Sequence, residues 1–195
     1  GTPDRRIIFA TDRLEKDYED VPGRWKGLRF LSCSRGNVLN HTDIRNSEIA
    51  VLMEGEIASP PDLSMNGTVL IHNSVASLAA RHAELFAVNS VFAHSGFSTV
   101  SLTEGGSYEF IHCTLSNRWE YSHRTEPALL ISPGDGVMPS VSVVNTVISG
   151  NLSNEMLIDA SAADAAFRFR ADSSLIKVDT MAASWYSTTL FRNVI

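Results

Sequence analysis

The stretch His112-Cys113-Thr114-Leu115 consists of a polar residue, a small residue, any residue and a large apolar residue. The pattern occurs six times in all, and its large apolar residues are Ile44, Ile71, Phe92, Leu115, Ile148 and Leu175. These residues are 27, 21, 23, 33 and 27 positions apart. Repetition at a nearly fixed period is typical of stacked repeat folds. The spacing therefore predicts a coil of 21–23 residues with occasional loop insertions.

A second apolar stretch follows each large apolar residue by about seven positions, at 49–52, 78–80, 100–102, 129–131 and 156–158. Between the two stretches lies a row of turn-forming residues, namely Asn46, Asn73, His94, Asn117 and Gly150. Asparagine and glycine tolerate left-handed backbone angles, so this row predicts one corner that is repeated on successive coils. Two short strands per coil, joined by this corner, predict an all-β stacked β-solenoid.

The alternation of residues within the pattern separates an inward face from an outward face. Small residues two positions before the large apolar ones share the inward face, and they are Thr42, Val69, Ser90, Cys113, Thr146 and Ser173. Cys113 is therefore expected to be a buried, unreactive thiol. A β-sandwich is the less favoured alternative, because Asn66-Gly67 is the only Asn-Gly hairpin signal. Helical periodicity is weak and limited to Asp12–Tyr18 and Ser161–Phe169.

Length and composition restrict the function classes. A chain of 195 residues with 44% hydrophobic and 19% charged residues is typical of one folded domain, which we assign to residues 1–195. The net charge of −6 argues against a nucleic-acid partner. No apolar run is long enough to span a membrane. The abrupt ends, Gly1-Thr2-Pro3 and Asn193-Val194-Ile195, suggest a piece of a longer protein.

The chain resembles a known family in the segments Asp12–Tyr18, Val21–Leu28, Gly105–Leu115 and Asn145–Asn151. It is similar to right-handed parallel β-helix proteins of the pectin-lyase-like superfamily, and most of all to surface proteins and lipoproteins of Gram-negative gut bacteria. The resemblance implies a right-handed parallel β-helix and export to the cell surface or periplasm. These motifs are specific for the fold and carry little information on activity.

The repeated rows contain no catalytic constellation. Glycoside hydrolysis needs two carboxyl groups within about 5–10 Å, and neither outward row supplies such a pair. His41 and His112 lie three coils apart, about 14 Å, so they cannot share a metal ion. We therefore expect no catalytic residues, no metal site and no cofactor in these rows.

The longest insertion separates Leu115 from Ile148, and its candidate binding residues are Trp119, Tyr121, His123, Arg124 and Glu126. Aromatic rings beside charged groups could stack on sugar rings and hydrogen-bond their hydroxyls. Alternatively, Trp119 and Tyr121 pack the loop onto the coil. Both readings remain open at this point.

Two functions follow as hypotheses. The favoured one is a non-catalytic, exported β-helix module for binding or display, with a surface polysaccharide or a protein as partner. The alternative is a polysaccharide lyase or glycoside hydrolase that acts on acidic glycans. Apolar residues in an outward row, Leu70, Val91 and Val147, suggest that something covers that face. Unpaired strand edges at the solenoid ends are a second site for self-association.

Overall fold

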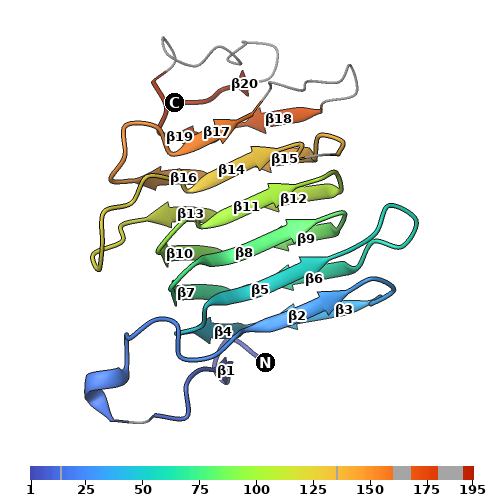
Figure 1. Cartoon of the computed structure of the whole chain (residues 1–195). Helices are drawn as coiled ribbons and strands as arrows, with labels where there is room; N and C mark the ends of the chain where they lie inside the picture. The colour runs from blue at the N-terminus through green and yellow to red at the C-terminus, as the bar shows by residue number, and fades with distance from the viewer. Residues whose placement is uncertain (14, 135, 160–167, 180–190) are drawn as a thin grey trace.

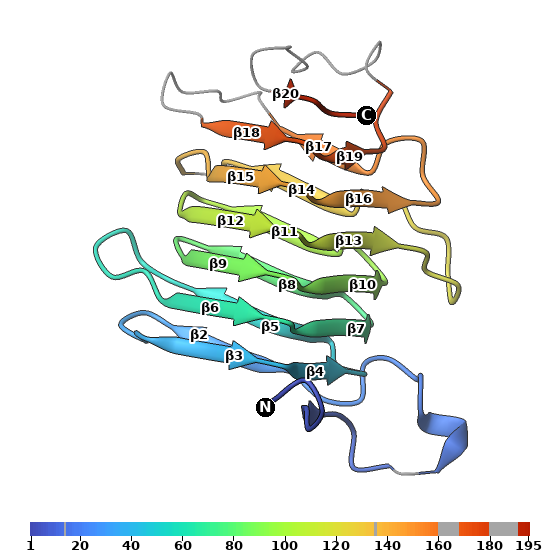
Figure 2. The same ribbon diagram turned by 180° about the vertical axis from the view of Figure 1, so that it is seen from behind.

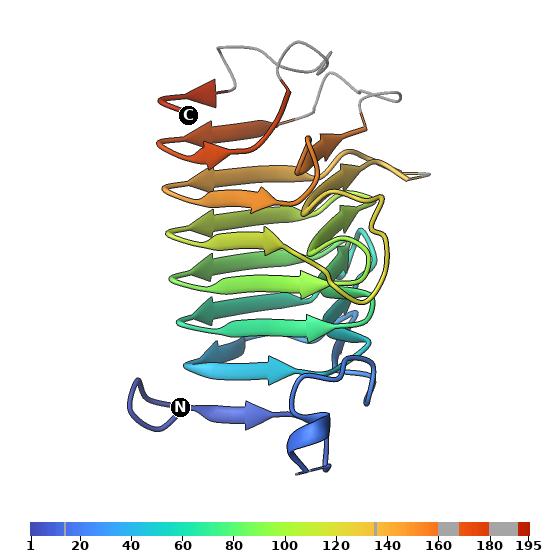
Figure 3. The same cartoon turned by 90° about the vertical axis from the view of Figure 1, so that its left-hand side faces the viewer.

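A computed structural model describes residues 1–13, 15–134, 136–159, 168–179 and 191–195. The chain forms a parallel β-solenoid of about five turns, and each full turn adds one strand to each of three parallel sheets. The prediction of an all-β parallel solenoid is confirmed. Figure 1 shows the coils stacked from the N-terminal strands at the bottom to the C-terminal strands at the top. Figure 3 shows the same stack from the side.

In the described part of the chain the three sheets contain twenty strands. The first sheet consists of β1 (Ile7–Phe9), β4 (Thr42–Arg45), β7 (Val69–Asn73), β10 (Val91–Ser95), β13 (Thr114–Asn117), β16 (Val147–Gly150) and β19 (Leu175–Ile176). The second consists of β2 (Leu28–Leu31), β5 (Ile49–Glu54), β8 (Ala76–Arg81), β11 (Val100–Thr103), β14 (Leu129–Ser132) and β17 (Met156–Ile158). The third consists of β3 (Asn37–Asn40), β6 (Asp62–Asn66), β9 (Glu84–Val88), β12 (Ser107–Ile111), β15 (Ser140–Val144), β18 (Phe169–Asp172) and β20 (Phe191–Arg192).

The solenoid is right-handed. In Figure 1 the near strands of the second sheet run from left to right while the chain climbs, and Figure 2 shows the strands on the opposite side also running from left to right when seen from behind. In the described residues the only helical element is the 3-10 turn η1 (Lys16–Tyr18), which lies within the weakly helical stretch Asp12–Tyr18. The other stretch, Ser161–Phe169, lies mostly outside the described residues, and its last residue begins β18.

A vertical column of large apolar residues fills the interior behind the first sheet. Its members are in register from coil to coil and at most 5% exposed: Ile44, Leu70, Phe92, Leu115, Ile148 and Ile176. The sequence pattern placed Ile71 and Leu175 in this column, and both assignments are wrong by one residue. Ile71 pairs with Arg45 and Ala93 on the outer side, and Leu175 is 46% exposed.

The coil length is about 26 residues on average. Successive members of the column are 26, 22, 23, 33 and 28 residues apart, so only the two shortest coils fall within the predicted range of 21–23. The longer coils carry loop insertions. Each complete coil has three strands, whereas the sequence analysis predicted two. The third-sheet strands were missed because only one or two residues separate each of them from the following first-sheet strand.

The first residue after each third-sheet strand forms a sharp corner of the solenoid. It has a positive φ on every coil: His41, Gly67, Asn89, His112, Asn145 and Ser173. One residue in this conformation turns the chain and shifts the in–out alternation by one position, so that Phe110 and Cys113 both point inward. The predicted corner row is only partly correct, because Asn46 and His94 have positive φ but Asn73, Asn117 and Gly150 do not.

The residue after each sharp corner forms a buried polar column, namely Thr42, Thr68, Ser90, Cys113, Thr146 and Ser174. The hydroxyl of Thr146 donates to the carbonyl of Val144 and accepts the backbone N–H of Cys113 from the neighbouring coil. Ser90 makes the same two contacts with Val88 and with Thr68 of the coil before it. The hydroxyls thus provide acceptors for the N–H groups of Cys113 and Thr68, which the bend removes from the sheet ladders. Burial of Cys113 confirms the expectation for this thiol.

The N-terminal end of the solenoid exposes apolar side chains. Strands β1, β2 and β3 are the edge strands of their sheets, and Ile7, Leu31 and Val38 are about half exposed. The outward apolar row of the first sheet differs from the predicted one, because Leu70 is fully buried in the core. The row in register consists of Val69, Val91, Thr114, Val147 and Leu175.

Candidate functional site

Two of the predicted binding residues are buried. Trp119 is 8% exposed, its ring lies 4.9 Å from that of Tyr121 at a tilt of 52°, and its indole N–H donates to the hydroxyl of Ser122. Arg124 is 3% exposed, and its guanidinium donates to the carbonyls of Asn117 and Glu126. Arg124 therefore ties the loop to the end of β13, and Trp119 packs within the loop.

The other three predicted residues lie nearer the surface. Tyr121 is 59% exposed, and its hydroxyl donates to the carbonyl of Asp20 in the N-terminal loop. His123 is exposed and Glu126 is half-buried. Beside this loop a carboxylate does meet an arginine, but that pair, Arg124 and Glu155, is sealed from solvent.

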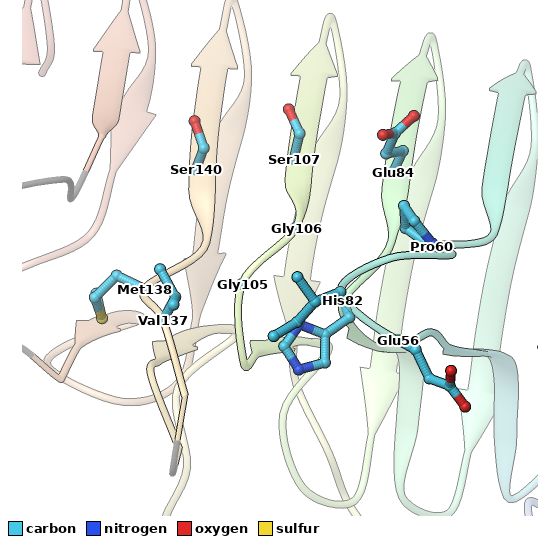
Figure 4. A pocket seen from close by; sticks show the side chains of 11 residues that line it. Glu56, Pro60, His82, Glu84, Gly105, Gly106, Ser107, Val137, Met138 and Ser140 are labelled. Atoms are coloured by element: carbon cyan, nitrogen blue, oxygen red, sulfur yellow. The ribbon is translucent and has the colours of Figure 1, made fainter. Parts of the chain in front are cut away.

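A pocket lies instead at the corner between the second and third sheets, and we call it the corner pocket. It has a volume of about 360 Å³, and three successive coils form its floor. Glu84, Ser107 and Ser140 are in register on neighbouring strands, and Figure 4 shows their side chains pointing the same way. His82 lies at the corner beside Gly105, and its side chain is 17% exposed.

Two loops form the walls of the corner pocket. One wall is the connection between β5 and β6, which contributes Glu56, Ile57 and Pro60 and is closed by an antiparallel bridge between Glu56 and Ser59. The opposite wall is the connection between β14 and β15, which contributes Val137 and Met138. Apolar walls around a few polar groups are typical of small-molecule sites.

Two glycines lie at the floor of the corner pocket, and no side chain fills the space above them. Gly105 and Gly106 both have positive φ, at 81° and 96°. A Cβ on Gly106 would lie 2.4 Å from the carbonyl oxygen of Ala83, so no other residue fits there without moving the backbone. Tyr108 packs beneath the pair and donates its hydroxyl to the carbonyl of Gly105. Burial raises the pKa of Tyr108, which therefore stays a neutral donor.

The corner pocket continues onto the outer face of the third sheet as a wider hollow, which we call the face groove. Its volume is about 570 Å³, and it shares Glu84 and Ser107 with the corner pocket. Phe86 lies in the groove with 43% of its surface exposed, and it pairs with Ser64 and Glu109 on the neighbouring strands. Pocket and groove together form one channel that crosses several coils.

The channel carries uncompensated negative charge. Among the described residues, the structure gives the carboxylates of Glu56, Glu84 and Glu109 no hydrogen-bond or ion-pair partner, and no lining residue is lysine or arginine. Asp62 is the exception among the carboxylates, because it accepts the backbone N–H groups of Gly36 and Asn37. Unpaired carboxylates in a concave surface raise the local negative potential.

Carboxylates on the second sheet show the opposite arrangement. Glu48 accepts two hydrogen bonds from Lys26, and Glu54 pairs with Arg29 and lies 3.8 Å from Arg81. In the part of the chain that the structure describes, no group of three or more His, Cys, Asp or Glu side chains is arranged to hold a metal ion. The same residues include no helix long and apolar enough to cross a membrane.

Sequence reasoning missed the corner pocket and the face groove. Local signals were present, namely the glycine pair Gly105-Gly106 at a coil corner and Pro60-Pro61 in an insertion. Their meaning depends on the third sheet, which the pattern did not separate from the first.

Comparison with known proteins identifies no relative: no family model matches the chain, and neither a curated protein nor a solved structure does. The structure thus shows a parallel β-solenoid, and none of the comparisons supports the resemblance to pectin-lyase-like surface proteins.

Proposed function

We propose that the chain is a non-catalytic carbohydrate-binding module, displayed at the cell surface or in the periplasm, and that a glycan lies in the face groove. The observation that supports this is Phe86, an exposed ring set between a serine and a glutamate that belong to neighbouring coils. An aromatic ring covers the apolar face of a sugar, while hydroxyls and carboxylates beside it hydrogen-bond the sugar hydroxyls.

The repeat of the solenoid favours an extended ligand. Ser107 and Ser140 follow Glu84 at intervals of one coil, about 4.8 Å, and Ser64 and Glu109 flank Phe86 in the same way. A linear polymer that runs along the solenoid axis meets a new set of polar groups on every coil. These strands position the groups rigidly, which limits the entropy lost on binding.

A glycan-binding screen followed by calorimetry tests the proposal. The Phe86→Ala variant should lose binding by about tenfold or more, because the stacking surface is removed. The matched control is Phe97→Ala, which removes a ring that is 46% exposed but lies in the connection between β10 and β11. Absence of any glycan ligand, or equal losses in the two folded variants, would count against the proposal.

A hydrolase is the second candidate, since Glu84 and Glu109 lie on neighbouring strands two positions out of register. Strand spacing places their Cα atoms about 8 Å apart, and glycosidases use carboxyl pairs separated by about 5–10 Å. Glu84 is exposed on an open face, so nothing shields it from water as a general acid requires. Release of reducing ends that disappears in both Glu84→Gln and Glu109→Gln would favour this candidate over binding alone.

A further inference from the structure

We propose that the N-terminal end of the solenoid is a dimerisation face, on which two copies of the chain dock head to head. This surface lies at the end of the stack and not in the face groove, so the proposal is independent of the proposed function. Three observations carry it: exposed core positions at this end, unpaired strand edges, and the contrast with the C-terminal end.

Core positions at the N-terminal end are open to solvent. Ile7 and Phe9 of β1 are in register with the buried residues Thr42 and Ile44, so their side chains lie on the inward face of the first sheet. Nevertheless, they are 48% and 37% exposed. Figure 1 shows β1 below the stack and the loop that carries η1 to one side of it. Apolar side chains of the interior therefore remain in contact with water at this end.

The same end presents three strand edges. In the described part of the chain β1, β2 and β3 each pair with a strand on one side only, and they belong to the three sheets that enclose the core. Leu28, Phe30 and Leu39 point inward from these edges and are only half-buried. Unpaired backbone groups on an edge strand favour pairing with another strand. An occupant that pairs with these edges and covers the interior needs strands on the same three sides, which is the arrangement at the end of another solenoid.

The C-terminal end differs, and this difference decides the orientation. Its edge strands are β17, β19 and β20, and their inward residues are between 1% and 6% exposed: Met156, Ile158, Ile176 and Phe191. A head-to-tail contact would place an open end against a covered one and bury little apolar surface on the second copy. Two N-terminal ends are both open, so a head-to-head contact removes apolar surface of each copy from water. Such a contact is isologous and stops at two copies.

Sedimentation of the 195-residue chain between about 1 and 100 µM tests the proposal. We expect monomers that convert to dimers as the concentration rises, without larger species. Ile7→Lys should weaken the dimer by about tenfold or more, because it places a charge in an apolar contact. The control is Leu31→Lys, which changes a residue of β2 that is 51% exposed but in register with Glu54 on the outer face. Circular dichroism checks that both variants fold.

Hydrogen exchange locates the contact in the unaltered chain, so the test does not depend on the folding of a variant. Backbone amides of β2 and β3 should exchange more slowly at high than at low protein concentration, because the dimer pairs their free edges. Amides of β17, at the opposite end of the second sheet, should exchange at the same rate at both concentrations.

Four results would overturn the proposal. A chain that stays monomeric over the whole concentration range forms no such dimer. Growth into species larger than dimers would favour head-to-tail stacking instead. Equal weakening by Ile7→Lys and Leu31→Lys would show that the open core is not the contact. Protection that appears away from β2 and β3 would place the contact elsewhere on the molecule.

Discussion

Arg124 and Glu155 form a buried ion pair, with their side chains 1% and 0% exposed and 2.5 Å between Nη2 and Oε1. Arg124 belongs to the insertion after β13, and Glu155 lies just before β17 on the next coil. The carboxylate of Glu155 also accepts the backbone N–H groups of Ala128 and Leu152. This network joins both ends of the insertion to the stack.

Loss of either partner should destabilise the fold. Arg124→Ala leaves the carboxylate of Glu155 buried without its counter-ion, and we expect a loss of about 3–5 kcal/mol in the free energy of unfolding. Urea denaturation measures the effect. Arg118→Ala removes an exposed arginine of the same loop and should change stability by less than about 0.5 kcal/mol. Similar losses in the two variants would show that the ion pair does not hold the insertion.

Stability should fall at mildly acidic pH because of His72. Its Nδ1 lies 3.0 Å from the carboxylate of Asp20, a contact without hydrogen-bond geometry, and its ring centroid lies 5.3 Å from that of His94. Burial lowers the pKa of His72, with further lowering by His94 and Arg45, and Asp20 opposes the shift. The folded state therefore binds fewer protons than the unfolded state below the ordinary value of 6.5.

The contribution of neutral His72 to the free energy of unfolding should be complete above pH 6.5. It should be lost as the pH falls toward the pKa of His72 in the folded state. His72→Asn is the test variant, because asparagine tolerates the positive φ of 56° at this corner. Urea midpoints between about pH 7.5 and 5 should decline more steeply for the wild type than for the variant. Parallel curves would exclude His72 as the source.

The two cysteines should differ in reactivity. Cys113 is 2% exposed, and burial raises its pKa to about 11, so little thiolate forms at neutral pH. Cys33 is exposed. Iodoacetamide should add one carbamidomethyl group to the native chain and two to the denatured chain, as read by mass spectrometry. In Cys33→Ser the native chain should stay unlabelled, and rapid labelling of that variant would contradict the buried position.

The stability of the fold should depend on how well the residue at the sharp corner tolerates a positive φ. Asn89 is exposed and has a φ of 50°, so a side chain there contributes little except through the backbone. Asn89→Val should cost about 1–2 kcal/mol of unfolding free energy, and Asn89→Gly should cost little or nothing. Thr114→Val provides the control at an outward position of extended backbone in β13. Equal stability of the two Asn89 variants would argue against a strained corner.

Much of the fold was accessible from local pattern. Each coil repeats the same alternation of apolar and polar residues, so the spacing of Phe92 and Leu115 predicted the stack and the first two sheets. The sequence did not assign the inward-pointing residue correctly where several adjacent residues are apolar. In Val69-Leu70-Ile71 only contact with Ile44 and Phe92 decides which side chain points inward.

The sequence by itself determined the solenoid. Every coil buries one face of each strand, so apolar residues recur along the chain at about the length of a coil. Only the tertiary structure decided the candidate site. Trp119 and Arg124 have the composition of a binding loop, yet Glu155 draws the arginine inside, and such pairing over 31 residues leaves no local trace. The corner pocket joins Glu56 to Val137, residues of two separate insertions that stacking brings to opposite sides of one corner. The number of residues in each coil decides which insertions stack at the same corner. The walls of the pocket therefore become neighbours only in the folded chain.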